Sequence, residues 1–145
     1  MSDFTNDYST TKATKFEILP KGEYLLRITD AVPGKAKSSG RNMVTVHYDV
    51  VKPDLYKGRK IMFHNVVFVA DGEPGAGKTA YYLKCINQPH EGKFEVNTKN
   101  WIGQKITAKV GIESYNGRDN NKVLDFDMPD YTVESPAVPD EEVPF

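Results

Sequence analysis

Runs of alternating apolar and polar residues, separated by clusters of glycine, proline and asparagine, constrain the fold of this chain more than any other feature. A period of two is typical of a strand with one buried face and one face toward solvent. Five segments are expected to form strands: residues 22–32, 43–51, 60–70, 104–114 and 121–127. Short connections between most of them favour antiparallel neighbours. The sequence therefore predicts an all-β domain.

One helix is expected between the third and fourth strands. Residues 79–88 place Ala80, Leu83, Lys84 and Asn87 on one side, and Pro89 would end the helix. Five strands with a helix in this place have the element order of the OB-fold, a five-stranded Greek-key β-barrel, although another small β-barrel stays open. The OB-fold binds oligonucleotides on the face of strands 2 and 3 and with two loops, here residues 33–41 and 114–120.

Charge is divided unevenly along the chain, although its net value is only −1. Residues 15–110 hold 16 basic and 9 acidic residues, a net charge of +7, whereas residues 131–145 hold four acidic residues and no basic one. A basic body with an acidic tail favours polyanion binding and an interaction tail. We therefore expect a disordered N-terminal arm (1–15), a body (16–128) and a disordered C-terminal tail (129–145).

Several classes of protein find no support in the sequence. The single cysteine, Cys85, cannot form an internal disulfide, and the polar first fifteen residues lack the apolar segment of a signal peptide. No apolar run is long enough to span a membrane. The three histidines and Cys85 show no metal-site spacing, and no catalytic constellation is visible. We therefore expect an intracellular binding protein, not an enzyme, with no metal, cofactor or membrane partner.

The C-terminal tip is the most specific motif. Its six residues are Asp140, Glu141, Glu142, Val143, Pro144 and Phe145. This tip resembles the acidic C-terminal tip of bacterial single-stranded DNA-binding proteins, in which an acidic run precedes an aliphatic residue, proline and a terminal phenylalanine. A partner protein can bury the terminal ring and bind the carboxylate with arginine or lysine. The resemblance implies that these six residues recruit replication or recombination proteins.

The body also resembles small phage-encoded single-stranded DNA-binding proteins of the OB type. The resemblance lies in LPKGEY (19–24), KSSGRNM (37–43), YKGRK (56–60), IGQK (102–105) and YNGR (115–118). It implies a role in phage DNA replication or recombination, in the cytoplasm of the host cell. Several copies of the chain could assemble, but no interface can be identified in the sequence.

Binding of single-stranded DNA without sequence preference needs a positive groove for phosphates and aromatic faces for bases. The basic candidates are Arg27, Lys35, Lys37, Arg41, Arg59, Lys60, Lys105, Arg118 and Lys122. The stacking candidates are Phe63, Phe68, Trp101 and Tyr115, with His47 and His64 as planar polar partners. Either Phe63 or Phe68 must face the core, because their positions differ in parity along one strand. Trp101 is more typical of a core residue than of a stacking platform.

Residues 72–79, Gly-Glu-Pro-Gly-Ala-Gly-Lys-Thr, fit the phosphate-binding P-loop pattern, and a nucleotide-binding enzyme is therefore an alternative. Such an enzyme needs a parallel sheet of strand–helix–strand units, and the 66 residues after Thr79 leave little room for one. The simpler interpretation is a flexible loop between strand and helix, with Thr79 as a helix cap. An RNA-binding module on the same fold and an adaptor that binds only proteins are further alternatives.

Overall fold

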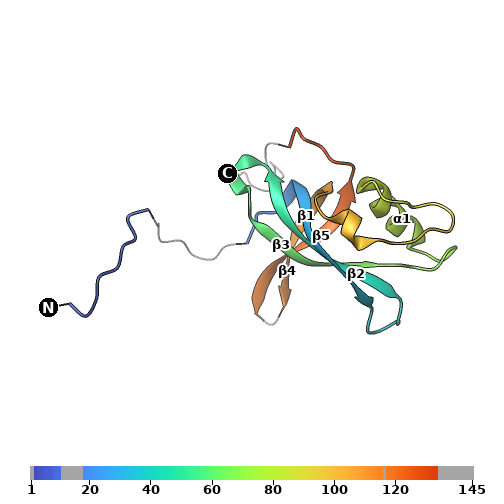
Figure 1. Cartoon of the computed structure of the whole chain (residues 1–145), viewed down its shortest axis with the longest axis horizontal. Coiled ribbons are helices and arrows are strands. Elements are labelled where there is room, and N and C mark those ends of the chain that lie inside the picture. Colours follow the sequence, from blue (N-terminus) through green and yellow to red (C-terminus); the bar gives the residue numbers. More distant parts are fainter. Residues whose placement is uncertain (1, 11–17, 116, 134–145) are drawn as a thin grey trace, which may run out of the picture.

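The computed structural model describes residues 2–10, 18–115 and 117–133. Its five strands are β1 (Gly22–Lys35), β2 (Asn42–Lys52), β3 (Lys60–Val67), β4 (Lys105–Tyr115) and β5 (Arg118–Asp127). One α-helix, α1 (Ala76–Cys85), lies between β3 and β4, and two short 3₁₀ helices are η1 (Asp54–Tyr56) and η2 (Thr98–Trp101). The predicted all-β class and element order are confirmed (Figure 1).

The alternating residues of each strand build the core. Residues Val44, Val46, Tyr48 and Val50 of β2 are all buried, as their period predicts. Opposite them lie the inward side chains of β1 and β4: Tyr24, Leu26, Ile28, Ile106, Ala108 and Val110. Ile112 has the same parity along β4 as these residues, but it is 42% exposed. At its position the β4–β5 hairpin has passed beyond the core and projects from the body (Figure 1).

All five strands form one antiparallel sheet in the order β3-β2-β1-β4-β5, so β3 and β5 are its two edges. The sheet curls until these edges approach each other through side chains, with the rings of His64 and Phe126 6.3 Å apart. The described strand pairs do not join β3 to β5, so the predicted barrel is open along this seam. The seam is the feature of the fold that shapes the cavity described below.

Helix α1 begins three residues earlier than predicted. Gly75, at φ +98°, is its N-cap, and Thr79 lies inside the first turn instead of capping the helix. Asn87, at φ +61°, takes the left-handed conformation that ends helices, and Gln88 N–H bonds back to the Leu83 carbonyl. The chain therefore leaves the helix before it reaches Pro89. The helix packs on the core with Tyr82, Leu83 and Cys85, whereas Lys84 is exposed.

The body reaches further toward the C-terminus than predicted. Val133 is buried, and Asp130 N–H donates to the Thr107 hydroxyl at 2.6 Å. Residues 129–133 therefore pack on the body, while the rest of the predicted tail lies outside the described residues. Residues 2–10 are exposed, form no helix or strand, and extend away from the body (Figure 1). Within the described ranges, no helix has the length and apolar character needed to cross a membrane.

Candidate functional site

The strands β1, β2 and β3 present a continuous surface away from the core, which we call the outer face. It comprises Arg27, Val32, Thr45, His47, Phe63 and Asn65. The register places Val32 beside Thr45 and Thr45 beside Asn65, whose side-chain oxygen accepts a hydrogen bond from the Thr45 hydroxyl at 2.9 Å. Strand β2 has 11 residues, so at about 3.3 Å per residue it spans about 33 Å along this face. The face is long enough to follow several nucleotides of an extended strand.

Phe63 is the most unusual residue of the outer face. It lies in a β-bulge, because His47 of β2 faces both Met62 and Phe63 of β3. Its φ is +65°, a conformation that is a true outlier for a bulky side chain. Its backbone N–H donates to His47 Nδ1 at 3.1 Å, and its ring stands perpendicular to the His47 ring at 5.0 Å. Although the local backbone is strained, the ring remains 70% exposed.

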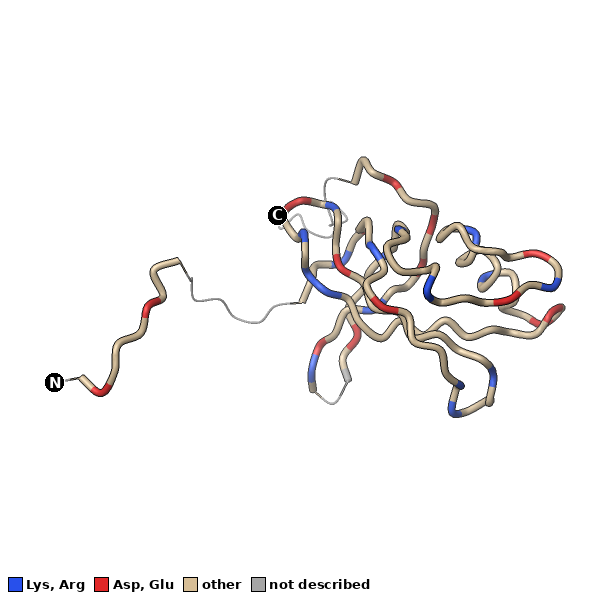
Figure 2. The backbone as a smooth tube through the Cα atoms, in the orientation of Figure 1, with Lys and Arg blue, Asp and Glu red and all other residues tan. Residues whose placement is uncertain are grey.

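Basic side chains lie beyond the outer face at the tip of the β1–β2 hairpin. Lys37 is exposed, Lys35 Nζ donates to Asn42 at 2.6 Å, and Arg41 forms an ion pair with Glu73. Figure 2 shows the blue segments of this hairpin together at the lower right of the body. The ion pair connects the hairpin to the loop before α1 and offsets part of the charge of Arg41. The two lysines have no such acidic partner within the described chain.

The other end of the outer face carries predicted basic residues that are partly neutralised. Arg27 donates to Asp49 at 2.7 Å, and this carboxylate raises the pKa of the guanidinium. Lys60 is the register partner of Asp49, and Lys105 is the register partner of Arg27 on β4. Lys105 Nζ lies 6.0 Å from the centre of the Tyr131 ring. Cations therefore flank the outer face at both ends, and each end holds one arginine that is paired with a carboxylate.

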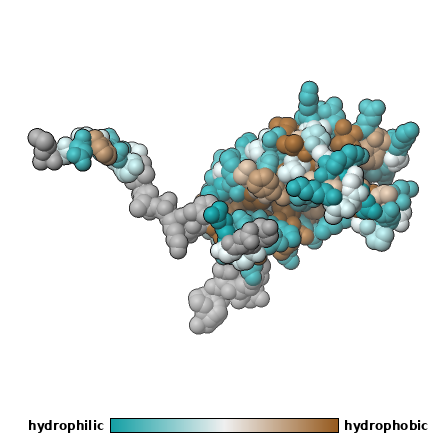
Figure 3. Space-filling view, turned by 90° about the horizontal axis from the view of Figure 1, so that it is seen from below, coloured by the Kyte–Doolittle hydropathy of each residue, from teal (hydrophilic) through white to brown (hydrophobic). Residues whose placement is uncertain are grey.

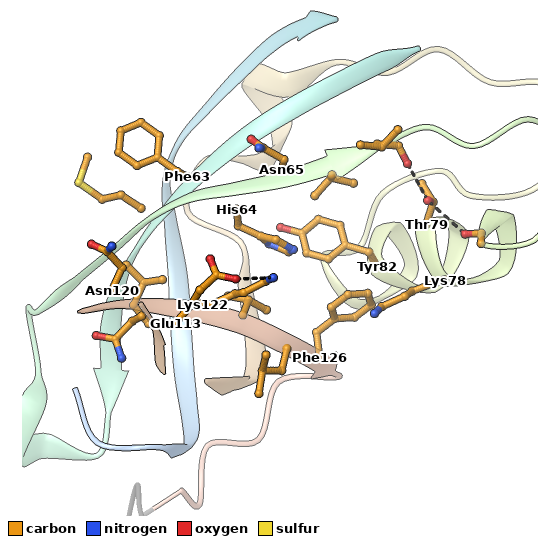
Figure 4. Close-up of a pocket in the computed structure, with 18 of the residues that line it drawn as sticks. Phe63, His64, Asn65, Lys78, Thr79, Tyr82, Glu113, Asn120, Lys122 and Phe126 are labelled. Carbon is orange, nitrogen blue, oxygen red and sulfur yellow. Dashed lines mark hydrogen bonds and ion pairs between the residues drawn. The ribbon is translucent and has the colours of Figure 1, made fainter. Parts of the chain in front are cut away.

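A cavity of about 980 Å³ lies between β3, β5 and α1 (Figure 4). Its walls include His64, Lys78, Tyr82 and Phe126, and Phe63 stands at its edge. The Tyr82 and Phe126 rings are 5.1 Å apart and perpendicular, and Lys78 Nζ lies 5.6 Å from the centre of Phe126. The β1–β2 and β4–β5 hairpins project toward the viewer of Figure 3. This view shows hydrophobic side chains among hydrophilic ones on the body. The cavity thus combines aromatic walls with a lysine.

His64 faces this cavity and does not stack on the outer face as predicted. Its Nδ1 is 2.6 Å from the Tyr48 hydroxyl, which is itself 2.6 Å from the Tyr82 hydroxyl. Burial, with a smaller contribution from the nearby charge of Lys78, lowers the pKa of His64 from 6.5 to about 4. The imidazole is therefore neutral at physiological pH. It ends a buried hydrogen-bonded chain of three side chains.

The lowered pKa of His64 predicts an acid-sensitive fold. The unfolded chain binds a proton on this residue below pH 6.5, whereas the folded chain resists protonation until about pH 4, so the stability falls as the pH drops through this window. Because of this residue, the free energy of unfolding is expected to be about 2 kcal/mol lower at pH 5 than at pH 7. Urea unfolding of the wild type and His64→Gln at both pH values measures the difference. Equal pH dependence in His64→Gln and the wild type would show that His64 does not have this role.

Two predicted stacking residues are removed from the candidate interface. Trp101 is 1% exposed, and its ring packs on Tyr82 at 6.0 Å and Phe68 at 6.5 Å. Phe68 is half-buried against the same core. Of the two phenylalanines that had to face opposite ways, Phe63 therefore points outward and Phe68 inward. Neither ring offers a free face to a base. Sequence periodicity could not place Trp101, because it follows an irregular segment.

The β4–β5 hairpin carries the remaining candidates. Lys122 is paired with Glu113 at 3.0 Å and lines the cavity, while Arg118 is exposed. Tyr115 and Arg118 are register partners at the end of the hairpin, and Gly117 has the positive φ of +74° that the predicted turn requires. The side chain of Tyr115 and the tip 140–145 lie outside what the structure describes. Arg59 is exposed in the turn before β3.

The P-loop-like segment does not lie in a parallel sheet of strand–helix–strand units. The sheet before and after it is antiparallel. The Thr79 hydroxyl, which would bind a metal ion in a P-loop, donates instead to the Val67 carbonyl at 2.9 Å. Lys78, however, lies beside the cavity. Its contact with Phe126 could not be predicted from the local sequence, because it depends on how the sheet curls.

A family model described as "Protein of unknown function (DUF669)" matches residues 4–139. The match covers the whole body, including the outer face and the cavity. No curated protein matches the chain.

Proposed function

The chain belongs to the DUF669 family, and we propose that it binds single-stranded DNA without preference for sequence. The observation that carries the proposal is Phe63, a strained aromatic residue that is 70% exposed on the face of β2 and β3. A ring held in this way contributes little to the core but offers a rigid platform for stacking a base. Base stacking tolerates any sequence, because every base has a flat face.

The charge around Phe63 supports the same proposal. The hairpin cations Lys35, Lys37 and Arg41 lie beyond one end of the outer face, and Lys60 lies at the other. A strand that stacks on Phe63 can place its phosphates near both groups. The strand order and the helix between β3 and β4 match an open OB-type sheet, in which β2 and β3 bind oligonucleotides. The proposal assigns the protein no catalysis.

We further propose that the protein acts in phage DNA replication or recombination, in the cytoplasm of the host cell. The support is the resemblance of its C-terminal tip to bacterial single-stranded DNA-binding proteins. In this proposal Asp140, Glu141 and Glu142 attract a basic site on a partner protein, and Phe145 fills an apolar pocket there. The DNA and the partner would therefore be bound by different parts of the chain.

Fluorescence anisotropy with a labelled dT oligonucleotide tests the proposed function. We expect binding that weakens as the salt concentration rises, because bound phosphates release counterions. Excess duplex DNA should fail to compete, and an RNA competitor separates the DNA-binding and RNA-binding alternatives. A chain without Phe145 should bind the oligonucleotide as the wild type does, since the tip is assigned to proteins. No binding, or equal competition by duplex, would refute the proposal.

A further inference from the structure

The cavity at the seam is built into the two edge strands. Each edge carries a bulge beside it: Met62 and Phe63 in β3 face one residue of β2, and Leu124 is the extra residue of β5. A bulge interrupts the row of N–H and C=O groups that another strand would need for pairing. These bulges keep the edges apart, so a space of about 980 Å³ remains where a closed barrel would have strand pairing.

The walls of this cavity suit a flat aromatic ligand. Phe126 is half-buried, and its ring lies 6.3 Å from His64 and 5.1 Å from Tyr82. The three rings form one connected aromatic surface (Figure 4). His64 Nδ1 is bonded to Tyr48, while its Nε2 forms no hydrogen bond to the described residues. When the Tyr48 hydroxyl donates to Nδ1, Nε2 carries the hydrogen and can donate to a ligand.

The charge of the cavity suits an anion. Lys60, Lys78 and Lys122 line it, whereas Glu113, the only acidic side chain among its described lining residues, is already paired with Lys122. Lys78 and Lys60 have no carboxylate within 4.0 Å in the described part of the chain. The first turn of α1, which holds Lys78, contains no acidic residue that would offset its charge. Aromatic walls with an unpaired lysine at their edge complement a nucleotide, which joins a flat base to a phosphate.

We propose that the cavity receives one everted nucleotide of the bound single strand, with its base against Phe126 and His64 and a phosphate near Lys78. The inference rests on the proposed function and extends it, because Phe63 belongs to both the outer face and the cavity edge. A strand that stacks on Phe63 therefore reaches the cavity directly. An unpaired base turns out of the strand at little cost, whereas a duplex must first break a base pair. The cavity would thus help to select single strands.

Photocrosslinking tests this proposal on the full chain. A dT oligonucleotide with 5-iodouracil at single positions is bound, irradiated and mapped by mass spectrometry. We expect crosslinks at Phe126, Tyr82 or His64 as well as at Phe63. Lys78→Ala should reduce the cavity crosslinks and the oligonucleotide affinity by about fivefold, as expected for one lost phosphate contact at 0.1 M salt. Lys84→Ala, an exposed lysine in the last turn of α1, is the matched control and should change neither.

The outcomes separate this proposal from the proposed function. Crosslinks at Phe63 alone, with tight oligonucleotide binding, would overturn the cavity proposal and leave single-strand binding standing. Absence of oligonucleotide binding would overturn both. Thermal unfolding with millimolar dTMP tests whether the cavity binds a free nucleotide instead of a nucleotide of the strand. If dTMP stabilises the protein in a way that depends on Lys78, and the strand forms no crosslinks in the cavity, the proposal is also overturned. If Lys78→Ala unfolds, Phe126→Leu, which keeps an apolar side chain, takes its place and should lose the cavity crosslinks.

Discussion

Replacing Phe63 by alanine is expected to weaken binding of a dT oligonucleotide by about 5- to 150-fold while the protein stays folded. The range corresponds to about 1–3 kcal/mol for one stacked base. The ring is 70% exposed, so its removal takes little apolar surface from the core. Fluorescence anisotropy gives the affinity, and thermal unfolding shows that the fold is retained.

Phe63→Gly separates binding from stability. Glycine adopts φ +65° without the cost of about 1–2 kcal/mol that a side chain pays in the left-handed region, although it loses more backbone entropy on folding. We expect this variant to lose DNA affinity as Phe63→Ala does. Its free energy of unfolding should equal that of the wild type or exceed it by up to about 1 kcal/mol. Leu55→Ala, which removes another exposed apolar side chain, is the control and should keep full affinity. Full affinity in both Phe63 variants would exclude the stacking role.

Replacing Lys35, Lys37 and Arg41 together by alanine is expected to reduce the affinity for a dT oligonucleotide by about 10- to 100-fold at 0.1 M salt. Each phosphate contact on a single strand contributes about 0.7 to the slope of log affinity against log salt, so the slope should fall by up to about 2. Arg41 contributes least by this reasoning, because Glu73 already offsets its charge. Titrations at four salt concentrations between 0.05 and about 0.3 M measure the slope.

A second triple variant controls for the change in net charge. Lys57, Lys93 and Lys99 are exposed lysines outside β1, β2 and β3, and their replacement by alanine removes the same charge. This control should weaken binding far less and leave the salt slope nearly unchanged. Equal losses in the two triple variants would mean that binding responds only to overall charge. The hairpin would then have no special place in the interface.

Much of the fold could be predicted from local patterns. The period of two along Val44, Val46, Tyr48 and Val50 identifies a strand with one buried face, because neighbouring side chains of any strand point to opposite sides. Gly117 in the second hairpin has the positive φ that the Asn-Gly turn predicts. The helix boundary was missed by three residues, because Gly75 supplies a left-handed N-cap that no capping side chain announces.

The candidate site could be predicted only in part. Parity required that Phe63 and Phe68 face opposite ways, but not which one faces out. The bulge at Met62 and Phe63 decides this, and it arises from the pairing of β3 with β2. The ion pairs of Arg27 with Asp49 and of Arg41 with Glu73 join residues 22 and 32 positions apart, so no local pattern shows that these cations are already partnered.

By itself, the sequence determined the strands, their turns and the separation of a basic body from an acidic tail. These are local properties, set by side-chain alternation, turn residues and charge along a few neighbouring positions. Only the tertiary structure decided that Trp101 belongs to the core, that His64 ends a buried hydrogen-bonded chain, and that Lys78 lies beside Phe126. The physical reason is the curl of the sheet, which brings β3, β5 and α1 together around one cavity although they are far apart in the chain.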